Sequence, residues 1–170
     1  MFDSHAHLQD ARITAPGEVW ERARASGVRR VLLAGVDSAD WQRQATLADL
    51  PGVSLSLGIH PQVVAVQSAS EREAELVRLE EALAKRGPSV VALGAIGMDG
   101  VGDRRSSYDA QAALFAAQLR LAKQHDLPVL LHILRAHEEA LDVVAQRRLV
   151  LDHQNALSHE PCLPRSRGAR

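Results

Sequence analysis

The sequence predicts an α/β fold of the parallel (β/α) TIM-barrel type, incomplete, with about five to six of the eight βα units that close such a barrel. Three observations support this prediction. Short apolar runs alternate with longer helical stretches over residues 1–147. A His-x-His pair, rather than a glycine-rich dinucleotide fingerprint, ends the first apolar run. The chain of 170 residues is also well short of the roughly 250 residues typical of a closed barrel.

The expected elements alternate in order along the chain. The apolar runs predict strands over 1–8, 28–34, 53–59, 89–96 and 127–133. Helical periodicity predicts helices over 16–26, 38–50, 70–86, 109–125 and 136–146. Pro16 suits a first helical turn, Gly27 suits a helix end, and Ser70 to Glu73 has the form of a capping box. In the helix that this box opens, Leu76, Val77, Leu79 and Leu83 are expected on one apolar face.

The domain is expected to cover 1–147, followed by a divergent, irregular tail over 148–170. Residues 147–151 are a candidate sixth strand, but 154–170 is polar, contains prolines and has no periodicity. A barrel that stops after five or six strands leaves a sheet edge and an apolar inner surface open. We therefore expect self-association through that edge.

Composition limits the classes of function. The net charge of −1 gives no basic excess for nucleic-acid binding, although an enzyme that meets phosphate through bound metal needs none. Aromatic residues make up 3% of the chain, which argues against base-stacking platforms. A single cysteine, Cys162, excludes an internal disulfide and suits the cytoplasm. No apolar run is long enough for a membrane span or a signal peptide.

The eight histidines are the main candidates for chemistry. His5, His7, His60 and His132 fall at or near the C-terminal ends of predicted strands, where barrel enzymes hold their active sites. His5 and His7 are two residues apart on an extended chain, so their side chains share a face and can bind one divalent ion. The alternative is a pair of histidines that are merely hydrogen-bonded within the fold.

The other candidates each have two interpretations. His60, before Pro61, can ligate metal or bind a substrate oxygen, or can be satisfied by local backbone. His132 can be a hydrogen-bonded core residue. Because His5 and His7 lie on another strand of the same sheet, we favour His132 as a metal ligand. Asp99, in the predicted loop after the fourth strand, can orient water or a ligating histidine, or can lie in solvent. Arg135 can meet phosphate or can cap a helix.

Four motifs in series resemble the TatD family of metal-dependent deoxyribonucleases, among the amidohydrolase-like barrels. The motifs are Phe-Asp-Ser-His-Ala-His-Leu at 2–8, Gly-Ile-His-Pro at 58–61, Ala-Leu-Gly-Ala-Ile-Gly-Met-Asp at 92–99 and Leu-Pro-Val-Leu-Leu-His at 127–132. Ala136 and His137 follow the last motif at the family's spacing. The resemblance runs in order from residue 1 to about 146.

The resemblance implies a TIM barrel that hydrolyses phosphodiester bonds in DNA with two divalent ions, Mg²⁺, Mn²⁺ or Zn²⁺. His5 and His7 then correspond to ligands of the more buried ion, and His132 to a ligand of the second. His60 corresponds to a substrate-phosphate contact and Asp99 to the catalytic aspartate of the fourth-strand motif. Arg135 is also expected to bind the substrate. His153 lies roughly where the family has its strand-six metal ligand.

Three departures from the family pattern matter. Ala95 stands where the family has a glutamate that bridges the two metals. Leu134 stands where the family has an arginine, with Arg135 one residue later. Beyond Arg147 the sequence does not resemble the family's sixth strand, and no counterpart of its strand-eight aspartate is present.

These departures leave three hypotheses open. The first is a TatD-type hydrolase of DNA. The second is a mononuclear hydrolase of an amide, lactone or phosphoester that uses His5, His7 and His132. The third is an inactive remnant with partial metal binding, which retains one of the two ions or neither.

Overall fold

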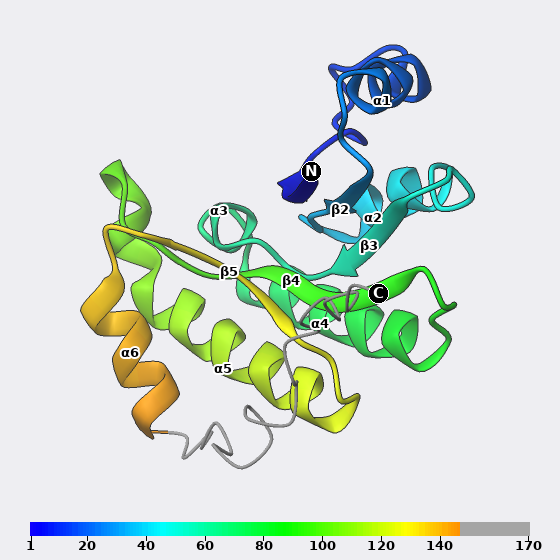
Figure 1. Cartoon of the computed structure of the whole chain (residues 1–170). Coiled ribbons are helices and arrows are strands. Elements are labelled where there is room, and N and C mark those ends of the chain that lie inside the picture. The colour runs from blue at the N-terminus through cyan, green and yellow to red at the C-terminus, as the bar shows by residue number, and fades with distance from the viewer. Residues whose placement is uncertain (147–170) are drawn as a thin grey trace, which may run out of the picture.

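A parallel five-stranded sheet carries the fold of this computed structural model, which describes residues 1–146 (Figure 1). Its strands are β1 Phe2–Ala6, β2 Arg30–Leu33, β3 Val53–Leu57, β4 Val90–Asp99 and β5 Val129–Leu134. The strands lie in sequence order, and each pairs in parallel with its neighbours along the chain. The sheet curls as half of a barrel, so the predicted α/β barrel-type architecture is confirmed.

Helices connect the parallel strands. They are α1 Pro16–Ala25, α2 Ser38–Ala45, α3 Pro61–Val64, α4 Ala69–Ala84, α5 Tyr108–Gln124 and α6 His137–Gln146, with a 3₁₀ helix η1 over Gly102–Ser107. Figure 1 shows α4 and α5 side by side on one side of β4 and β5, while α1 lies at the opposite end of the molecule. Because all five strands are parallel, their carboxyl ends lie at the same edge of the sheet.

Local sequence explains the helix boundaries. Pro16 opens α1, where its missing N–H is not needed, and Gly27 follows the helix with φ of +95°, a conformation that glycine adopts without strain. The Asp37 side chain caps α2 by accepting a hydrogen bond from the backbone N–H of Asp40 at 2.7 Å. These caps satisfy N–H groups that the first helical turns leave without partners.

The core has two clusters on the two halves of the sheet. The larger lies between β3–β5 and the helices α4 and α5, around Leu79, Leu93 and Phe115. The smaller packs β1–β3 against Trp20 of α1. Each large apolar side chain buried in this way stabilises the fold by roughly 1.5–3 kcal/mol.

The fourth strand differs from the prediction. It was expected to end at residue 96, with Asp99 in the following loop, but β4 runs to Asp99. The reason is pairing: β5 continues alongside, so that Asp99 is in register with Leu134. Asp99 is consequently a strand residue with no exposed surface rather than a solvated loop carboxylate.

Several predictions about helices were also wrong. The capping box is formed by Ser68 and Glu71, not by Ser70 and Glu73. Ser68 and Glu71 have the same Ser-x-x-Glu spacing as Ser70 and Glu73, and capping at Ser68 lets the helix begin at Ala69. Val77, expected on the apolar face of α4, is 52% exposed. The helix predicted over 38–50 ends at Ala45, and the short α3 and η1 were not expected.

Several apolar side chains on β5, an edge strand in the described part of the chain, lie in solvent. Val129, Leu131 and Leu134 are 39%, 44% and 42% exposed. Within residues 1–146, no helix has the length and apolar character needed to cross a membrane. The predicted sixth strand, the tail over 148–170 and His153 fall outside the described residues.

Candidate active site

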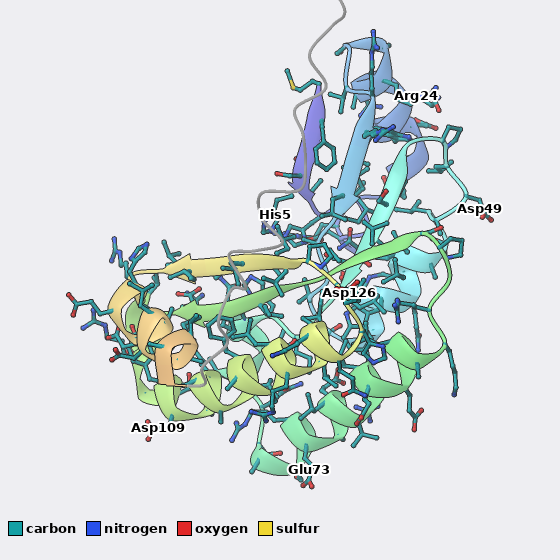
Figure 2. The ribbon with its side chains drawn as sticks, turned by 60° about the horizontal axis from the view of Figure 1, so that its bottom comes forward. His5, Arg24, Asp49, Glu73, Asp109 and Asp126 are labelled. Atoms are coloured by element: carbon teal, nitrogen blue, oxygen red, sulfur yellow. The ribbon has the colours of Figure 1, made fainter. Side chains whose placement is uncertain are left out.

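The candidate residues gather at the carboxyl edge of the sheet. His5 lies at the end of β1, as Figure 2 shows, and His7 follows it. His60 follows β3, Asp99 ends β4, and His132 lies in β5. His132 is in register with Gly97, two residues before Asp99 on the neighbouring strand. Because side chains two apart in a strand share a face, Asp99 and His132 meet.

The four histidines form two edge-to-face pairs. The ring centroids of His5 and His7 are 5.2 Å apart, and those of His60 and His132 are 4.2 Å apart. Burial lowers the pKa of His60 to about 3, with His132 and His7 adding to the effect. Burial, followed by the neighbouring His7 and His132, also lowers the pKa of His5. Both rings are therefore neutral at neutral pH, the form that can bind a metal ion.

The hydrogen bonds assign a different task to each member of the second pair. His60 Nδ1 accepts the backbone N–H of Gln62 at 3.2 Å, so the neutral ring carries its proton on Nε2 and offers a donor. His132 Nε2 lies 3.3 Å from Asp99 Oδ2. With a proton on Nε2, directed at this carboxylate, the His132 ring keeps a lone pair on Nδ1. His60 thus suits a substrate oxygen, while His132 suits a metal ion.

Asp99 is surrounded by donors. Its carboxylate accepts the backbone N–H of Val101 at 2.9 Å, Gln62 Nε2 at 3.0 Å and Arg104 Nη1 at 3.2 and 3.3 Å, in addition to His132. Burial alone raises the pKa of Asp99, but these hydrogen bonds and the charge of Arg104 outweigh burial and lower it. An ionised carboxylate with its lone pairs in use is a poor proton acceptor. The contacts favour Asp99 as a residue that orients His132; a direct catalytic role stays a prediction.

Histidine nitrogens suit a divalent ion, but the described histidines are arranged in pairs rather than as a larger set of metal ligands. Within residues 1–146, no three His, Cys, Asp or Glu side chains are gathered closely enough to hold one ion. Ala95, in place of the family's bridging glutamate, is fully buried and supplies a methyl group. The candidate ligands are therefore the paired imidazoles of His5 and His7 and, apart from that pair, Nδ1 of His132.

Arg135, another predicted residue, does not join the site. Arg135 follows β5 with φ of +52° and is exposed. Its carbonyl oxygen accepts the Tyr108 hydroxyl at 3.1 Å, but in residues 1–146 its guanidinium makes no hydrogen bond or ion pair. Substrate binding by Arg135 stays a prediction.

Comparison with known proteins agrees with this arrangement. Residues 2–159 match the family described as TatD-related DNase. The chain belongs to this family. The match continues past residue 147, where we expected the resemblance to end.

Individual TatD relatives are similar over most of this chain. An uncharacterized metal-dependent hydrolase of Escherichia coli, YjjV, is 32% identical over 81% of this chain and 52% of its own length. The 3'-5' ssDNA/RNA exonuclease TatD of Pantoea vagans is 32% identical over 99% of this chain and 58% of its own. The crystal structure of YjjV superimposes with a TM-score of 0.77, covering 88% of this chain and 56% of that protein. The chain thus spans about half the length of the TatD relatives it matches.

Sequence reasoning missed two buried glutamines behind this TatD site. On α5, Gln118 accepts the backbone N–H of Ile59 at 2.7 Å and donates to its carbonyl at 3.1 Å. Two helical turns earlier, Gln111 accepts the backbone N–H of Asp99 at 2.7 Å and donates to its carbonyl at 3.2 Å. Both are 1% exposed. Their spacing of seven within an apolar helix face was the available signal.

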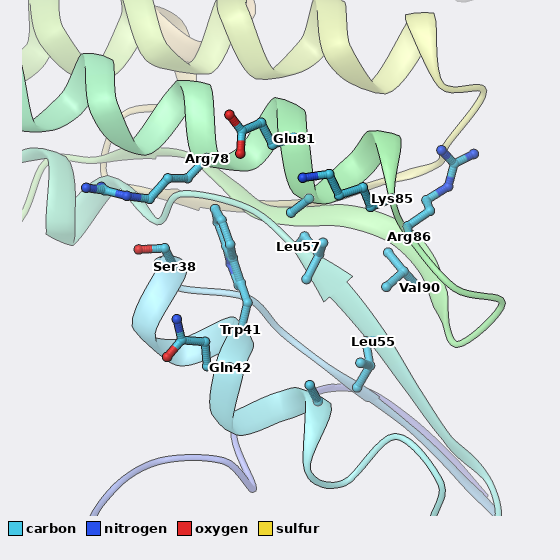
Figure 3. Close-up of a pocket in the computed structure, with 12 residues that line it drawn as sticks. Ser38, Trp41, Gln42, Leu55, Leu57, Arg78, Glu81, Lys85, Arg86 and Val90 are labelled. Atoms are coloured by element: carbon cyan, nitrogen blue, oxygen red, sulfur yellow. The ribbon is translucent and has the colours of Figure 1, made fainter.

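One cavity in the described TatD fold lies away from this site. It holds about 440 Å³ between α2 and α4 (Figure 3). Trp41, Leu55, Leu57 and Val90 contribute apolar walls, and no histidine lines it. Its lining also includes Ser38, Glu81 and Lys85, but none of the candidate site residues. We therefore assign the chemistry to the histidine edge.

Proposed function

We propose that this chain acts as a TatD-type metal-dependent hydrolase of phosphodiester bonds in DNA. The contact between the buried Asp99 carboxylate and His132, beside the neutral His60, carries the proposal. A carboxylate that orients a histidine, which keeps its other ring nitrogen free, is the usual support of a metal ligand in proteins. The name of the exonuclease TatD from Pantoea vagans supports nucleic acid as the substrate class.

Each residue has a definite task in this proposal. His5 and His7 as one pair, and His132 through Nδ1, would supply ligands for a divalent ion such as Mg²⁺, Mn²⁺ or Zn²⁺. When bound, such an ion lowers the pKa of a coordinated water and polarises a phosphate oxygen. His60 donates its Nε2–H to a phosphate oxygen of the strand. Asp99 fixes the ring orientation of His132, and Gln62 restrains both His60 and Asp99.

A nuclease assay tests the proposal. End-labelled single-stranded and duplex DNA are incubated with the chain in Mg²⁺, Mn²⁺ or Zn²⁺, and in a chelator. We expect metal-dependent cleavage, and a loss of about 100-fold or more in His132→Asn, as for groups that hold a catalytic metal. His137→Asn, an exposed histidine on α6, is the matched control and should retain activity. The proposal is contradicted if cleavage continues in the presence of the chelator, or if His132→Asn cleaves DNA as well as the parent does.

A second candidate is a metal-binding protein without turnover. Ala95 in place of a carboxylate favours it, together with the arrangement of the described histidines as pairs. Elemental analysis of the purified chain should then find one divalent ion at most, and DNA should stay intact. Two tightly held ions would contradict this candidate. Cleavage of a small aryl ester or amide, but not of DNA, would instead support a mononuclear hydrolase of another substrate.

We also propose a cytoplasmic location. The single cysteine suits a reducing compartment. Fractionation of cells that express the gene tests this, and recovery from an extracytoplasmic fraction would contradict it.

A further inference from the structure

We infer that Arg104 binds a backbone phosphate of the nucleic-acid substrate at the mouth of the histidine site. The inference rests on the proposed function for its substrate class. It concerns a residue of η1, the 3₁₀ helix that follows β4.

The guanidinium of Arg104 lies beside Asp99 and has N–H donors that the described residues do not use. Its Nη1 lies within hydrogen-bond distance of both Asp99 oxygens, at 3.3 and 3.2 Å. Within residues 1–146, its Nη2 and Nε make no hydrogen bond, and the side chain is 34% exposed. A guanidinium has five N–H donors in a planar fork that matches two phosphate oxygens. One edge of the fork therefore faces the buried carboxylate, and the other donors are free for an anion.

The position of this guanidinium relative to the site follows from a shared atom. Arg104 Nη1 and His132 Nε2 both lie within 3.3 Å of Asp99 Oδ2. A phosphate that reaches the candidate metal ligand His132 is therefore close to Arg104.

The backbone of Arg104 is held in place rather than free on a loop. Its carbonyl oxygen accepts Gln111 Nε2 at 3.0 Å and the Ser107 hydroxyl at 2.7 Å. Gln111 is itself buried and also holds the backbone of Asp99. A side chain on a backbone held in this way loses less conformational entropy when it binds a ligand. This distinguishes Arg104 from Arg105, its exposed neighbour.

The sequence offers a reason for a cation here. Leu134 occupies the place of the family's strand-five arginine, and the Arg135 guanidinium makes no contact with the described site residues. Arg104, which lies in η1, reaches the Asp99 carboxylate that also contacts His132. Its charge also compensates the buried Asp99, which explains why the two side chains are together in the absence of substrate.

Salt-dependent binding of single-stranded DNA tests the inference. The full chain is titrated with Mg²⁺ present into a fluorescein-labelled, phosphorothioate-linked oligothymidylate, which resists cleavage, and anisotropy is recorded. Over about 50 to 200 mM KCl, we expect Arg104→Gln to reduce the slope of log affinity against log salt by about 0.7, the value for one phosphate contact on a single strand. Affinity at low salt should fall about tenfold. Arg104→Lys should keep the slope, while Arg105→Gln should match the parent in both quantities.

The outcomes separate this inference from the proposed function. If Arg104→Gln binds with the slope and affinity of Arg105→Gln, Arg104 is only a counter-ion for Asp99 and the inference is wrong, while metal-dependent cleavage still supports the proposed function. If the parent binds no oligonucleotide and cleaves none, both fail. Should Arg104→Gln not fold, the double variant Asp99→Asn, Arg104→Gln is compared with Asp99→Asn alone. The same reduction in slope is expected, and its absence overturns the inference.

Discussion

Gln118 connects the core of α5 to the segment that carries His60, and its replacement should be costly. The side chain is 1% exposed and pairs with both backbone groups of Ile59, itself 1% exposed. Gln118→Met keeps the length of the side chain but removes both hydrogen bonds. Each buried backbone group left without a partner costs about 1–3 kcal/mol, so the free energy of unfolding should fall by about 2–6 kcal/mol. For a chain of this size, that lowers Tm by roughly 5–20 °C.

The assay is urea and thermal unfolding followed by circular dichroism. Gln124→Met on the same helix is the matched control, because Gln124 is exposed and a surface substitution changes stability by about 0.5 kcal/mol or less. DNA cleavage should fall in Gln118→Met even below its Tm, since His60 directly follows Ile59. A loss of stability no larger than that of Gln124→Met would refute the reasoning that the backbone of Ile59 depends on Gln118 for its hydrogen bonds.

Three further predictions test the metal site, a buried carboxylate and the sheet edge. Ala95 is fully buried, so Ala95→Glu should be destabilised by several kcal/mol in chelator. Mn²⁺ or Zn²⁺ should then raise the Tm and metal content of Ala95→Glu more than those of the parent, and equal increases would argue against a metal position there. Burial raises the pKa of Asp40 above its ordinary value of about 3.9, so its ionised form is disfavoured in the folded state. The stability of the parent relative to Asp40→Asn should be greatest in acid and decline as pH rises through the folded-state pKa, as read by urea unfolding; a difference that grows with pH would contradict this. Leu131 is 44% exposed on β5, so the parent should self-associate in light scattering and Leu131→Lys less so, whereas a monomeric parent would refute this prediction.

The buried glutamines show why the site could be only partly predicted. His5, His7, His60 and His132 were found because they fall at or near the C-terminal ends of predicted strands, where barrel enzymes hold their active sites. Gln118 sits in a helix whose pattern reads as amphipathic with or without it. Its role depends on Ile59, 59 residues away in the chain. Helical periodicity carries no information about which strand end a buried amide will meet.

Asp99 was identified correctly as a site residue but placed wrongly. The glycine-rich stretch after residue 96 suggested a loop, because glycine weakens strands that stand alone. Pairing with β5 overrides this preference and extends β4 to Asp99. Strand length depends on the neighbouring strand, which local propensity does not contain.

By itself, the sequence determined the parallel α/β class, the order of the elements and the family, because alternating apolar periodicity and four spaced motifs are local properties of the chain. Only the tertiary structure decided that Asp99 Oδ2 meets His132 and Arg104 together, and that His60 offers a donor rather than a lone pair. These facts arise from the register of β4 against β5 and from the turn at Gln62. Such contacts between strand ends assign protons and charges to particular atoms, and they exist only once the sheet has curled.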